Sequence, residues 1–156
     1  MNSVIEQFYE AFQQLDAEKM VACYHNDITF SDPAFGILRG DEACNMWRML
    51  CRSQKNKNFD LSYSNIVVDG IRGSADWEAI YTFSKTDRTI HNNIHAEFTF
   101  RDGKIYTHAD QFNLYIWARQ ALGPTGWLIG WTPLFRRSIQ HKTRQMLNKF
   151  SVSQSE

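Results

Sequence analysis

With 156 residues, 43% of them apolar, the chain has the size and composition of one domain with its own hydrophobic core. Lys and Arg together number 17, as do Asp and Glu, so the balanced charge predicts neither a nucleic-acid nor a membrane partner. Aromatic residues make up 14%, which suits a fold with a lined cavity. The charges are unevenly placed, since no Asp or Glu lies between Asp110 and Glu156, and this predicts a basic, solvated face on a terminal helix.

The three cysteines, Cys23, Cys44 and Cys51, leave at least one thiol unpaired, which fits a reducing cytoplasm. Cys44 and Cys51 are two helical turns apart and are predicted to pack in a core rather than bind metal. The first residues have neither the basic nor the apolar region of a signal peptide, and no apolar run is long enough to span a bilayer. We therefore expect a soluble, cytoplasmic protein.

The first third of the chain predicts helices. Ser3 and Glu6 have the spacing of a capping box, and apolar residues at helical spacing follow them. Asp16 is placed to cap a second, short helix. After a short strand at 28–32, a third helix begins at Gly40-Asp41-Glu42, where negative charge suits the first turn.

From residue 59 onward the pattern alternates between apolar and polar residues, which indicates strands. The predicted strands are 59–68, 75–83, 90–100 and 104–112. Helices followed by a meander of long antiparallel strands define an α+β protein. A long curved sheet with helices packed on its concave face forms a cone, and the interior of such a cone is a buried, mostly apolar pocket.

The C-terminal part is predicted to contain a short helix at 114–122, stopped by Gly123-Pro124, and a final helix at 134–150 with a basic face. The glycine-punctuated segment Gly126–Trp131 fits neither pattern. We expect a domain core at 1–123, a C-terminal extension of the same domain at 124–150, and a disordered polar tail at 151–156.

His108 and Asp110 follow the turn dipeptide Asp102-Gly103, which separates two alternating runs and predicts a β-hairpin. Side chains two residues apart on a strand point to the same face. An imidazole beside a carboxylate on one rigid strand is the smallest set of groups for proton transfer. This pair is therefore the first candidate for a catalytic site.

Two segments of the chain carry recognisable motifs. The first contains Ser31-Asp32-Pro33 and Leu38-Arg39-Gly40-Asp41, and the second runs from Asp102-Gly103 through His108-Ala109-Asp110 to Arg119-Gln120-Ala121-Leu122-Gly123. These segments resemble the SnoaL-like branch of the nuclear transport factor 2-like superfamily, whose cone fold also hosts steroid isomerases and limonene epoxide hydrolase. Together they cover most of residues 4 to 123. The resemblance implies a cystatin- or nuclear transport factor 2-like α+β barrel that commonly forms homodimers.

The same resemblance implies roles for single residues. In the polyketide cyclases of this branch, the Asp matching Asp110 is the general acid/base of an intramolecular aldol ring closure, and the assisting histidine falls at Ala96, with His95 one residue away. Ketosteroid isomerases have their base at the position of Asp32, but their oxyanion-hole tyrosine falls at Phe8 and their second acid near Ala96. This chain therefore lacks part of the catalytic residues of both the cyclases and the isomerases.

The length of the hairpin loop decides which face His108 and Asp110 occupy. With the two-residue turn Asp102-Gly103, His108 lies opposite Glu97 and Asp110 opposite His95, on a polar outer face. With a three-residue loop from Arg101 to Gly103, His108 lies opposite Ala96 and Asp110 opposite Ile94, on an apolar wall. The resemblance favours the second register, in which burial raises the pKa of Asp110 and makes it a better base.

The remaining candidates each have an alternative role. The His108–Asp110 pair can equally be a structural hydrogen bond, and Asp32 can cap a turn instead of facing the pocket. Aromatic residues at these spacings are also usual in a plain core. The predicted ligand-binding residues are Phe8, Phe12, Tyr24, Phe30, Trp47, Trp77, Ala96, Phe98 and Phe112.

His91, His95 and His108 with Asp110 are possible metal ligands, but the strand spacings let only two of them converge easily, so no metal is predicted. We expect an enzyme of the SnoaL-like kind that needs no cofactor and acts on a hydrophobic, carbonyl-bearing small molecule. Asp110 would be its acid/base, His108 would orient it or stabilise an oxyanion, and Asp32 would be the second polar group. The alternative is a non-catalytic ligand-binding or dimerisation module of the same fold.

Overall fold

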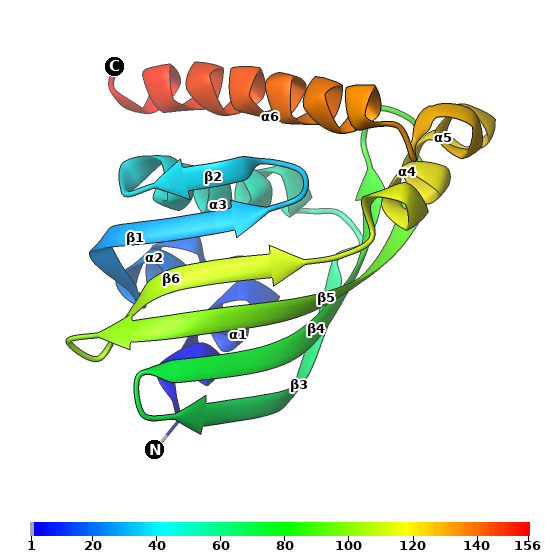
Figure 1. Cartoon of the computed structure of the whole chain (residues 1–156). Helices are drawn as coiled ribbons and strands as arrows, with labels where there is room; N and C mark the ends of the chain where they lie inside the picture. Colours follow the sequence, from blue (N-terminus) through cyan, green and yellow to red (C-terminus); the bar gives the residue numbers. More distant parts are fainter. Residues whose placement is uncertain (1) are drawn as a thin grey trace.

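The computed structural model describes residues 2–156, which form a curved sheet with helices on its concave side (Figure 1). Within these residues the elements are, in order, α1 (Val4–Gln13), α2 (Ala17–Ala22), β1 (Tyr24–Asp32), β2 (Gly36–Arg39), α3 (Asp41–Gln54), β3 (Asp60–Asp69), β4 (Arg72–Phe83), β5 (Arg88–Arg101), β6 (Lys104–Gln111), α4 (Leu114–Leu122), α5 (Pro124–Ile129) and α6 (Pro133–Gln154). In this part of the chain the sheet has six strands, in the spatial order β2-β1-β6-β5-β4-β3. The predicted α+β class, with its curved sheet, is confirmed.

One pair of neighbouring strands departs from the wholly antiparallel sheet that the sequence predicts. β1 and β6 run parallel, because the chain leaves β1 and returns beside it only after β2, α3 and the β3–β5 meander. A parallel pair needs such a long crossover connection. The short strand β2 was not predicted, since its four residues directly follow the Asp32-Pro33 turn.

The predicted helix starts are confirmed by their caps. Ser3 Oγ accepts a hydrogen bond from the Glu6 N–H, while a Glu6 carboxylate oxygen accepts one from the Ser3 N–H at 2.6 Å. Asp16 accepts a hydrogen bond from the Lys19 N–H at the start of α2. Each cap satisfies backbone donors that a helix leaves unpaired. The apolar stripe of α1 can thus begin at Ile5 and enter the concave face of the sheet.

The β5–β6 hairpin differs from both registers that the sequence allows. The turn is the two-residue one, with positive φ angles of 52° at Asp102 and 72° at Gly103, as in a type I′ turn. A bulge then makes Tyr106 an extra residue, because Phe100 pairs with Ile105 but Thr99 pairs with Thr107.

This bulge reverses the side of the sheet that the rest of β6 presents. Beyond it, His108 lies opposite Phe98 and Asp110 opposite Ala96, and both side chains are buried. The two predicted sets of partners are therefore wrong. The bulge lies inside the strand and not in the turn, which is why turn chemistry alone cannot place it.

The unassigned segment after residue 123 forms the short helix α5, which packs closely on α4 (Figure 1). A Cβ atom on Gly126 would overlap the backbone carbonyl of Ala118, and one on Gly130 would lie 2.7 Å from the Ala118 Cβ. Only glycine permits this approach of two backbones. The glycines form the inner side of α5, and the large side chains between them, Trp127, Leu128 and Ile129, remain 43% to 75% exposed.

α4 is fixed to the end of β5 by one amide side chain. Gln120 Oε1 accepts the N–H of His91 at 2.7 Å, and its Nε2 donates to the carbonyl of His91 at 3.0 Å. His91 lies in the part of β5 that no longer pairs with β6, because the pairing of the two strands ends at His95 and Gln111. Gln120 thereby supplies the hydrogen bonds that a neighbouring strand would make.

α6 runs along β2 and α3 (Figure 1) and begins at a Thr132 cap followed by Pro133. The helix continues to Gln154, so the tail predicted to start at residue 151 is largely helical in the structure. A tertiary contact supports the helix at this point, since the side chain of Asn45 in α3 donates a hydrogen bond to Ser151 Oγ at 3.2 Å. Within residues 2–156, every helix is too short or too polar to cross a bilayer.

Candidate functional site

Apart from the tyrosines, His108 and Asp110 are the two buried polar residues among residues 2–156, and both lie on the concave face of the sheet. His108 Nε2 and Asp110 Oδ1 are 2.9 Å apart, and their side chains are 0% and 3% exposed. The two residues are two positions apart on β6, so their side chains share one face, and the bulge at Tyr106 makes this the inner face of the sheet. The structure therefore brings the predicted pair together and buries it.

The pair belongs to a longer chain of hydrogen bonds. Trp47 Nε1 donates to the hydroxyl of Tyr24 at 2.7 Å, and that hydroxyl lies 2.7 Å from His108 Nδ1. At the other end, Trp77 Nε1 donates to Asp110 Oδ1 at 3.2 Å. We call this set, Trp47, Tyr24, His108, Asp110 and Trp77, the inner relay.

The indole donors fix the direction of the inner relay. An indole nitrogen can only donate, so the Tyr24 hydroxyl accepts from Trp47 and, when His108 is the neutral imidazole, donates its own proton to His108 Nδ1. His108 Nδ1 is then an acceptor, and Nε2 carries the proton donated to Asp110 Oδ1. Two N–H groups thus occupy Oδ1, while Asp110 Oδ2 has no hydrogen bond within residues 2–156. Oδ2 is the oxygen placed to exchange a proton with a ligand.

Aromatic rings enclose His108. The ring centroids of Phe98, Phe30 and Phe8 lie 4.5, 5.2 and 5.4 Å from that of the imidazole. Trp47 stacks on it at 6.0 Å. A substrate has no free face of His108 to contact, so the geometry supports a role in orienting Asp110 rather than in stabilising an oxyanion.

The other predicted lining residues divide into two groups. The first group belongs to the main core: the ring centroids of Phe12 and Trp77 are 5.5 Å apart, and Ala96 lies directly opposite Asp110 in the sheet. Phe112 instead packs with a separate small cluster that contains Leu114. It follows β6, where the chain turns away from the sheet into α4.

Asp32 lies at the end of β1, next to the end of β6 that carries Asp110. Ser31 pairs with Ala109 in the parallel ladder, so the following residues, Asp32 and Asp110, are neighbours on the inner face. Burial raises the pKa of Asp32 to about 7, and the charge of Asp110 adds to this. Asp32 therefore carries a proton for part of the time near neutral pH.

Asp32 also closes the turn that follows it. Its Oδ1 accepts the N–H groups of Ala34 at 2.9 Å and Phe35 at 2.6 Å, which lowers the pKa and partly offsets the effect of burial. This is the turn-capping role that an Asp before proline can have. Oδ2 of Asp32 makes no hydrogen bond within residues 2–156, so the cap leaves one oxygen for a second role.

Tyr9 is a polar residue of the interior that the sequence pattern did not indicate. It is fully buried among Tyr63, Trp77 and Phe98, and its hydroxyl has no hydrogen-bond partner among the described residues. Burial raises its pKa well above the ordinary value, and the charge of Asp110 contributes. On a helix stripe Tyr9 reads as core, and only its unpaired hydroxyl marks it as a candidate site residue.

The other histidines of the strands point the opposite way. His95 Nδ1 pairs with Asp76 at 2.6 Å and His91 Nε2 with Glu78 at 2.7 Å, on the outer face of the sheet. They do not approach His108. No group of three side chains with metal-binding atoms comes together within residues 2–156.

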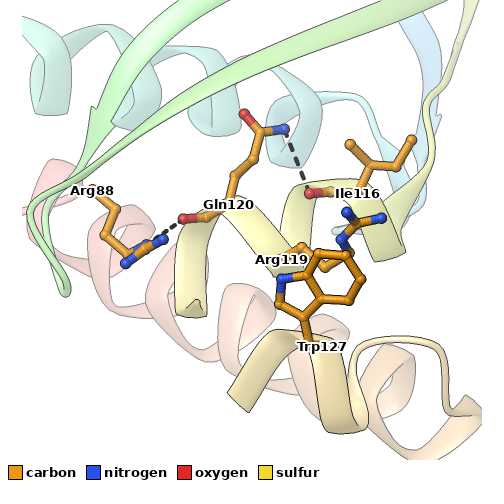
Figure 2. Close-up of a pocket in the computed structure, with 5 residues that line it drawn as sticks. All are labelled: Arg88, Ile116, Arg119, Gln120 and Trp127. Atoms are coloured by element: carbon orange, nitrogen blue, oxygen red, sulfur yellow. Dashed lines mark hydrogen bonds between the residues drawn. The ribbon is translucent and has the colours of Figure 1, made fainter. Parts of the chain in front are cut away.

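Two surface hollows lie away from the inner relay. One of about 410 Å³ lies beside α4 and α5 (Figure 2), and one of about 470 Å³ lies between α1, α2 and the β5–β6 turn. Neither is lined by His108 or Asp110. Asp110 is 5% exposed, and its neighbours Asp32 and Trp77 are both only partly buried.

Solved structures share this cone fold. A protein named TerC, co-crystallised with polyporic acid, is 18% identical, with 76% of this chain and 95% of TerC covered and a TM-score of 0.63. An epoxide hydrolase of the limonene epoxide hydrolase-like kind from M. tuberculosis is 20% identical, with coverages of 81% and 92% and a TM-score of 0.60. A candidate polyketide cyclase from Xanthomonas campestris is 22% identical, with coverages of 76% and 93% and a TM-score of 0.58.

The sequence comparison gives the family. The model of the SnoaL-like domain matches residues 5–108, which is more than half of the chain. The protein thus has the nuclear transport factor 2-like cone fold, and the chain belongs to the SnoaL-like domain family. No curated protein matches the chain significantly.

Proposed function

We propose that this protein is a small-molecule enzyme whose cavity carboxylates perform acid/base chemistry, without a cofactor, on a hydrophobic carbonyl compound. The observation that carries the proposal is the inner relay, which holds Asp110 by Oδ1 and leaves Oδ2 open beside Asp32. Isomerisation, cyclisation and aldol reactions all begin with removal of a proton next to a carbonyl. One positioned carboxylate is sufficient for that step.

The two carboxyl groups would have different tasks. Asp110 would take the proton through Oδ2, while His108, which is enclosed by rings, acts as a positioning residue through Oδ1. Asp32, with a pKa of about 7, would donate a proton to the developing oxyanion or to the product. Two neighbouring carboxyl groups in different environments are a usual arrangement for an acid and a base.

Tyr9 would be the second donor of the site. Its phenol proton has no acceptor among residues 2–156, and a buried hydroxyl in that condition is destabilising unless a ligand or water pairs with it. The isomerase tyrosine is replaced by Phe8 in this chain, and Tyr9 is the adjacent residue of α1. An oxygen of the substrate between Tyr9 and Asp110 would satisfy both groups.

The test is native mass spectrometry of the protein isolated from an extract of its own host, as wild type and as Asp110→Asn. We expect the variant to retain a small hydrophobic compound that the wild type converts after it is added back. The matched control is Asp76→Asn, which alters a carboxylate paired with a histidine on the outer face. Conversion by Asp110→Asn at the wild-type rate would exclude Asp110 as the base.

One observation favours a second function, a ligand-binding or structural module without turnover. The rings around His108 pack at 4.5 to 6.0 Å and occupy the space beside the imidazole. In that case the inner relay only satisfies buried polar groups. The same experiment separates the two functions, because a module would yield the compound unchanged from both proteins, or no compound from either.

A further inference from the structure

α4, α5 and the first turn of α6 form one corner of the molecule (Figure 1). This corner exposes large apolar side chains. Four of them, Trp127, Leu128, Trp131 and Leu134, are 54% to 75% exposed. We call the whole set the corner patch, and its members are Ile116, Trp127, Leu128, Ile129, Trp131 and Leu134. Single exposed apolar residues are common on proteins, but a contiguous group of this kind marks an interaction surface.

The corner patch is exposed because of the way α5 is held. Gly126 and Gly130 lie against Ala118 of α4, so they form the buried side of the short helix. Leu128 is 75% exposed, and Trp127 is still 54% exposed although its ring stacks on Arg119 of α4. The same close contact that fixes α5 therefore presents its bulky side chains to the outside.

Arginines surround the corner patch without carboxylate partners. Arg88, Arg119, Arg136 and Arg137 form no ion pair with any carboxylate within residues 2–156. The sequence has no Asp or Glu from residue 111 to residue 155. The turn beside Arg88 contributes Lys85 and Asp87, whose charges cancel. The corner is thus apolar at its centre and positive around it.

The hollow beside α4 and α5 shows how two of these arginines are held (Figure 2). The guanidinium of Arg119 stacks on Trp127 at 3.3 Å from the ring centroid, and Arg88 Nε donates to the Gln120 carbonyl at 2.7 Å. The terminal nitrogens of both remain free of hydrogen bonds within residues 2–156. About 410 Å³ of space lies between them, next to the exposed apolar side chains.

We propose that the corner patch docks this protein on the surface of a bilayer that contains anionic lipid. Trp, Leu and Ile side chains would enter the boundary between headgroups and acyl chains, while the four arginines contact lipid phosphates. Trp is favoured in that boundary because its ring is apolar and its N–H is polar. This inference is independent of the proposed function and departs from the expectation drawn from the balanced net charge.

The charge of the corner distinguishes a bilayer from a second copy of the chain. A twofold dimer formed through the corner patch would bring the positive edges of the two copies together. No carboxylate of residues 111–155 is present to pair with them, so like charges would face each other around the apolar centre. An anionic surface complements both the apolar centre and the positive edge.

Vesicle co-sedimentation tests the proposal. The full-length protein should sediment with phosphatidylcholine vesicles that contain phosphatidylglycerol and not with phosphatidylcholine alone, and added NaCl should release it. Replacing two apolar residues, Leu128→Ser with Leu134→Ser, should weaken binding by about tenfold or more. Replacing two charges, Arg136→Gln with Arg137→Gln, should weaken it and flatten the salt dependence.

A matched control uses exposed apolar residues elsewhere. Val68→Ser with Ile71→Ser changes the β3–β4 turn, where these residues are also at least half exposed, and should leave vesicle binding unchanged. Equal loss in this control, or no binding of the wild type to either vesicle, would overturn the proposal. So would a wild-type oligomer that Leu128→Ser with Leu134→Ser dissociates in light scattering, because a second copy would then cover the corner patch.

Discussion

The sheet carries one histidine–carboxylate pair on its inner face and two on its outer face, and the inner pair differs from the outer pair of His95 and Asp76 in burial and in hydrogen-bond partners. The inner pair, His108 and Asp110, is 0% and 3% exposed, while the outer pair, His95 and Asp76, is 48% and 44% exposed. The outer pair is the shorter, at 2.6 Å against 2.9 Å. Distance alone would therefore select the wrong pair, and burial with the supporting hydrogen bonds identifies the one that can act on a ligand.

The surroundings explain why the two pairs are unequal. Water competes for every hydrogen bond of the outer pair, so it is worth little in stability. The inner pair is shielded from water, so His108 Nδ1 depends on the Tyr24 hydroxyl and Asp110 Oδ1 on the indole of Trp77 as additional partners. A residue of the outer pair can thus be replaced at little cost in stability, whereas replacing a residue of the inner pair leaves its partners without a hydrogen bond.

The largest difference should appear when each histidine is removed. His108→Leu leaves the Tyr24 hydroxyl and Asp110 without their central partner, and we expect a loss of about 3 kcal/mol or more in the free energy of unfolding. His95→Leu should change it by at most about 0.5 kcal/mol. Urea denaturation of both variants measures this, and equal losses would show that burial does not separate the pairs.

Two tyrosines of the interior sharpen the comparison. Tyr24→Phe removes a hydroxyl with two partners and should destabilise the protein by about 1–3 kcal/mol. Tyr9→Phe removes a hydroxyl with no partner among the described residues, and should be neutral or stabilise the protein by about 1 kcal/mol. The same substitution would thus have opposite signs in the same assay. A clear loss in Tyr9→Phe would mean that its hydroxyl has a partner in solution.

The pH dependence of stability should also differ between the faces. Burial raises the pKa of Asp32 to about 7 in the folded protein, so the folded chain holds more protons than the unfolded chain between pH 3.8 and about 7. Stability from this group therefore falls as pH rises through that range. Asp32→Asn should remove this part of the slope in urea denaturation series, while Asn still accepts the turn hydrogen bonds.

The control for that slope is the outer carboxylate. Hydrogen bonds from His95 and Asn65 lower the pKa of Asp76, so its contribution is present above the ordinary pKa and is lost as pH falls. Asp76→Asn should thus change the slope in the opposite direction to Asp32→Asn. Slopes that change in the same direction would contradict the assignment of Asp32.

The smallest expected effect is that of salt on the outer pairs. His91→Gln and His95→Gln replace partners of Glu78 and Asp76, and each should change the free energy of unfolding by less than about 0.5 kcal/mol. Adding salt should reduce even that difference. A difference unaffected by salt would indicate that these pairs are covered in solution.

The sequence predicts elements well where a local signal decides them. Ser3 with Glu6, Asp16, and Gly123-Pro124 each mark a helix boundary that the structure has. α5 could not be predicted, because its glycines serve a contact with Ala118 and not a turn. Nothing in the sequence around these glycines indicates that they contact Ala118.

The candidate site was predictable in its residues and not in its arrangement. His108 and Asp110 follow from strand parity and the resemblance, but the orienting donors Tyr24, Trp47 and Trp77 come from three separate elements. Sequence patterns show them only as aromatic residues. The unpaired hydroxyl of Tyr9 becomes visible only when every neighbour is in place.

The bulge at Tyr106 has a consequence for how related sequences are compared. A relative that lacks this extra residue must be aligned with its gap inside β6, two residues before His108, although gaps are usually placed in turns. If the gap is left out, the register beyond the bulge shifts by one, and His95 is taken for the partner of Asp110 in place of Ala96. An alignment that misses this one residue would thus exchange the inner and the outer face of β6.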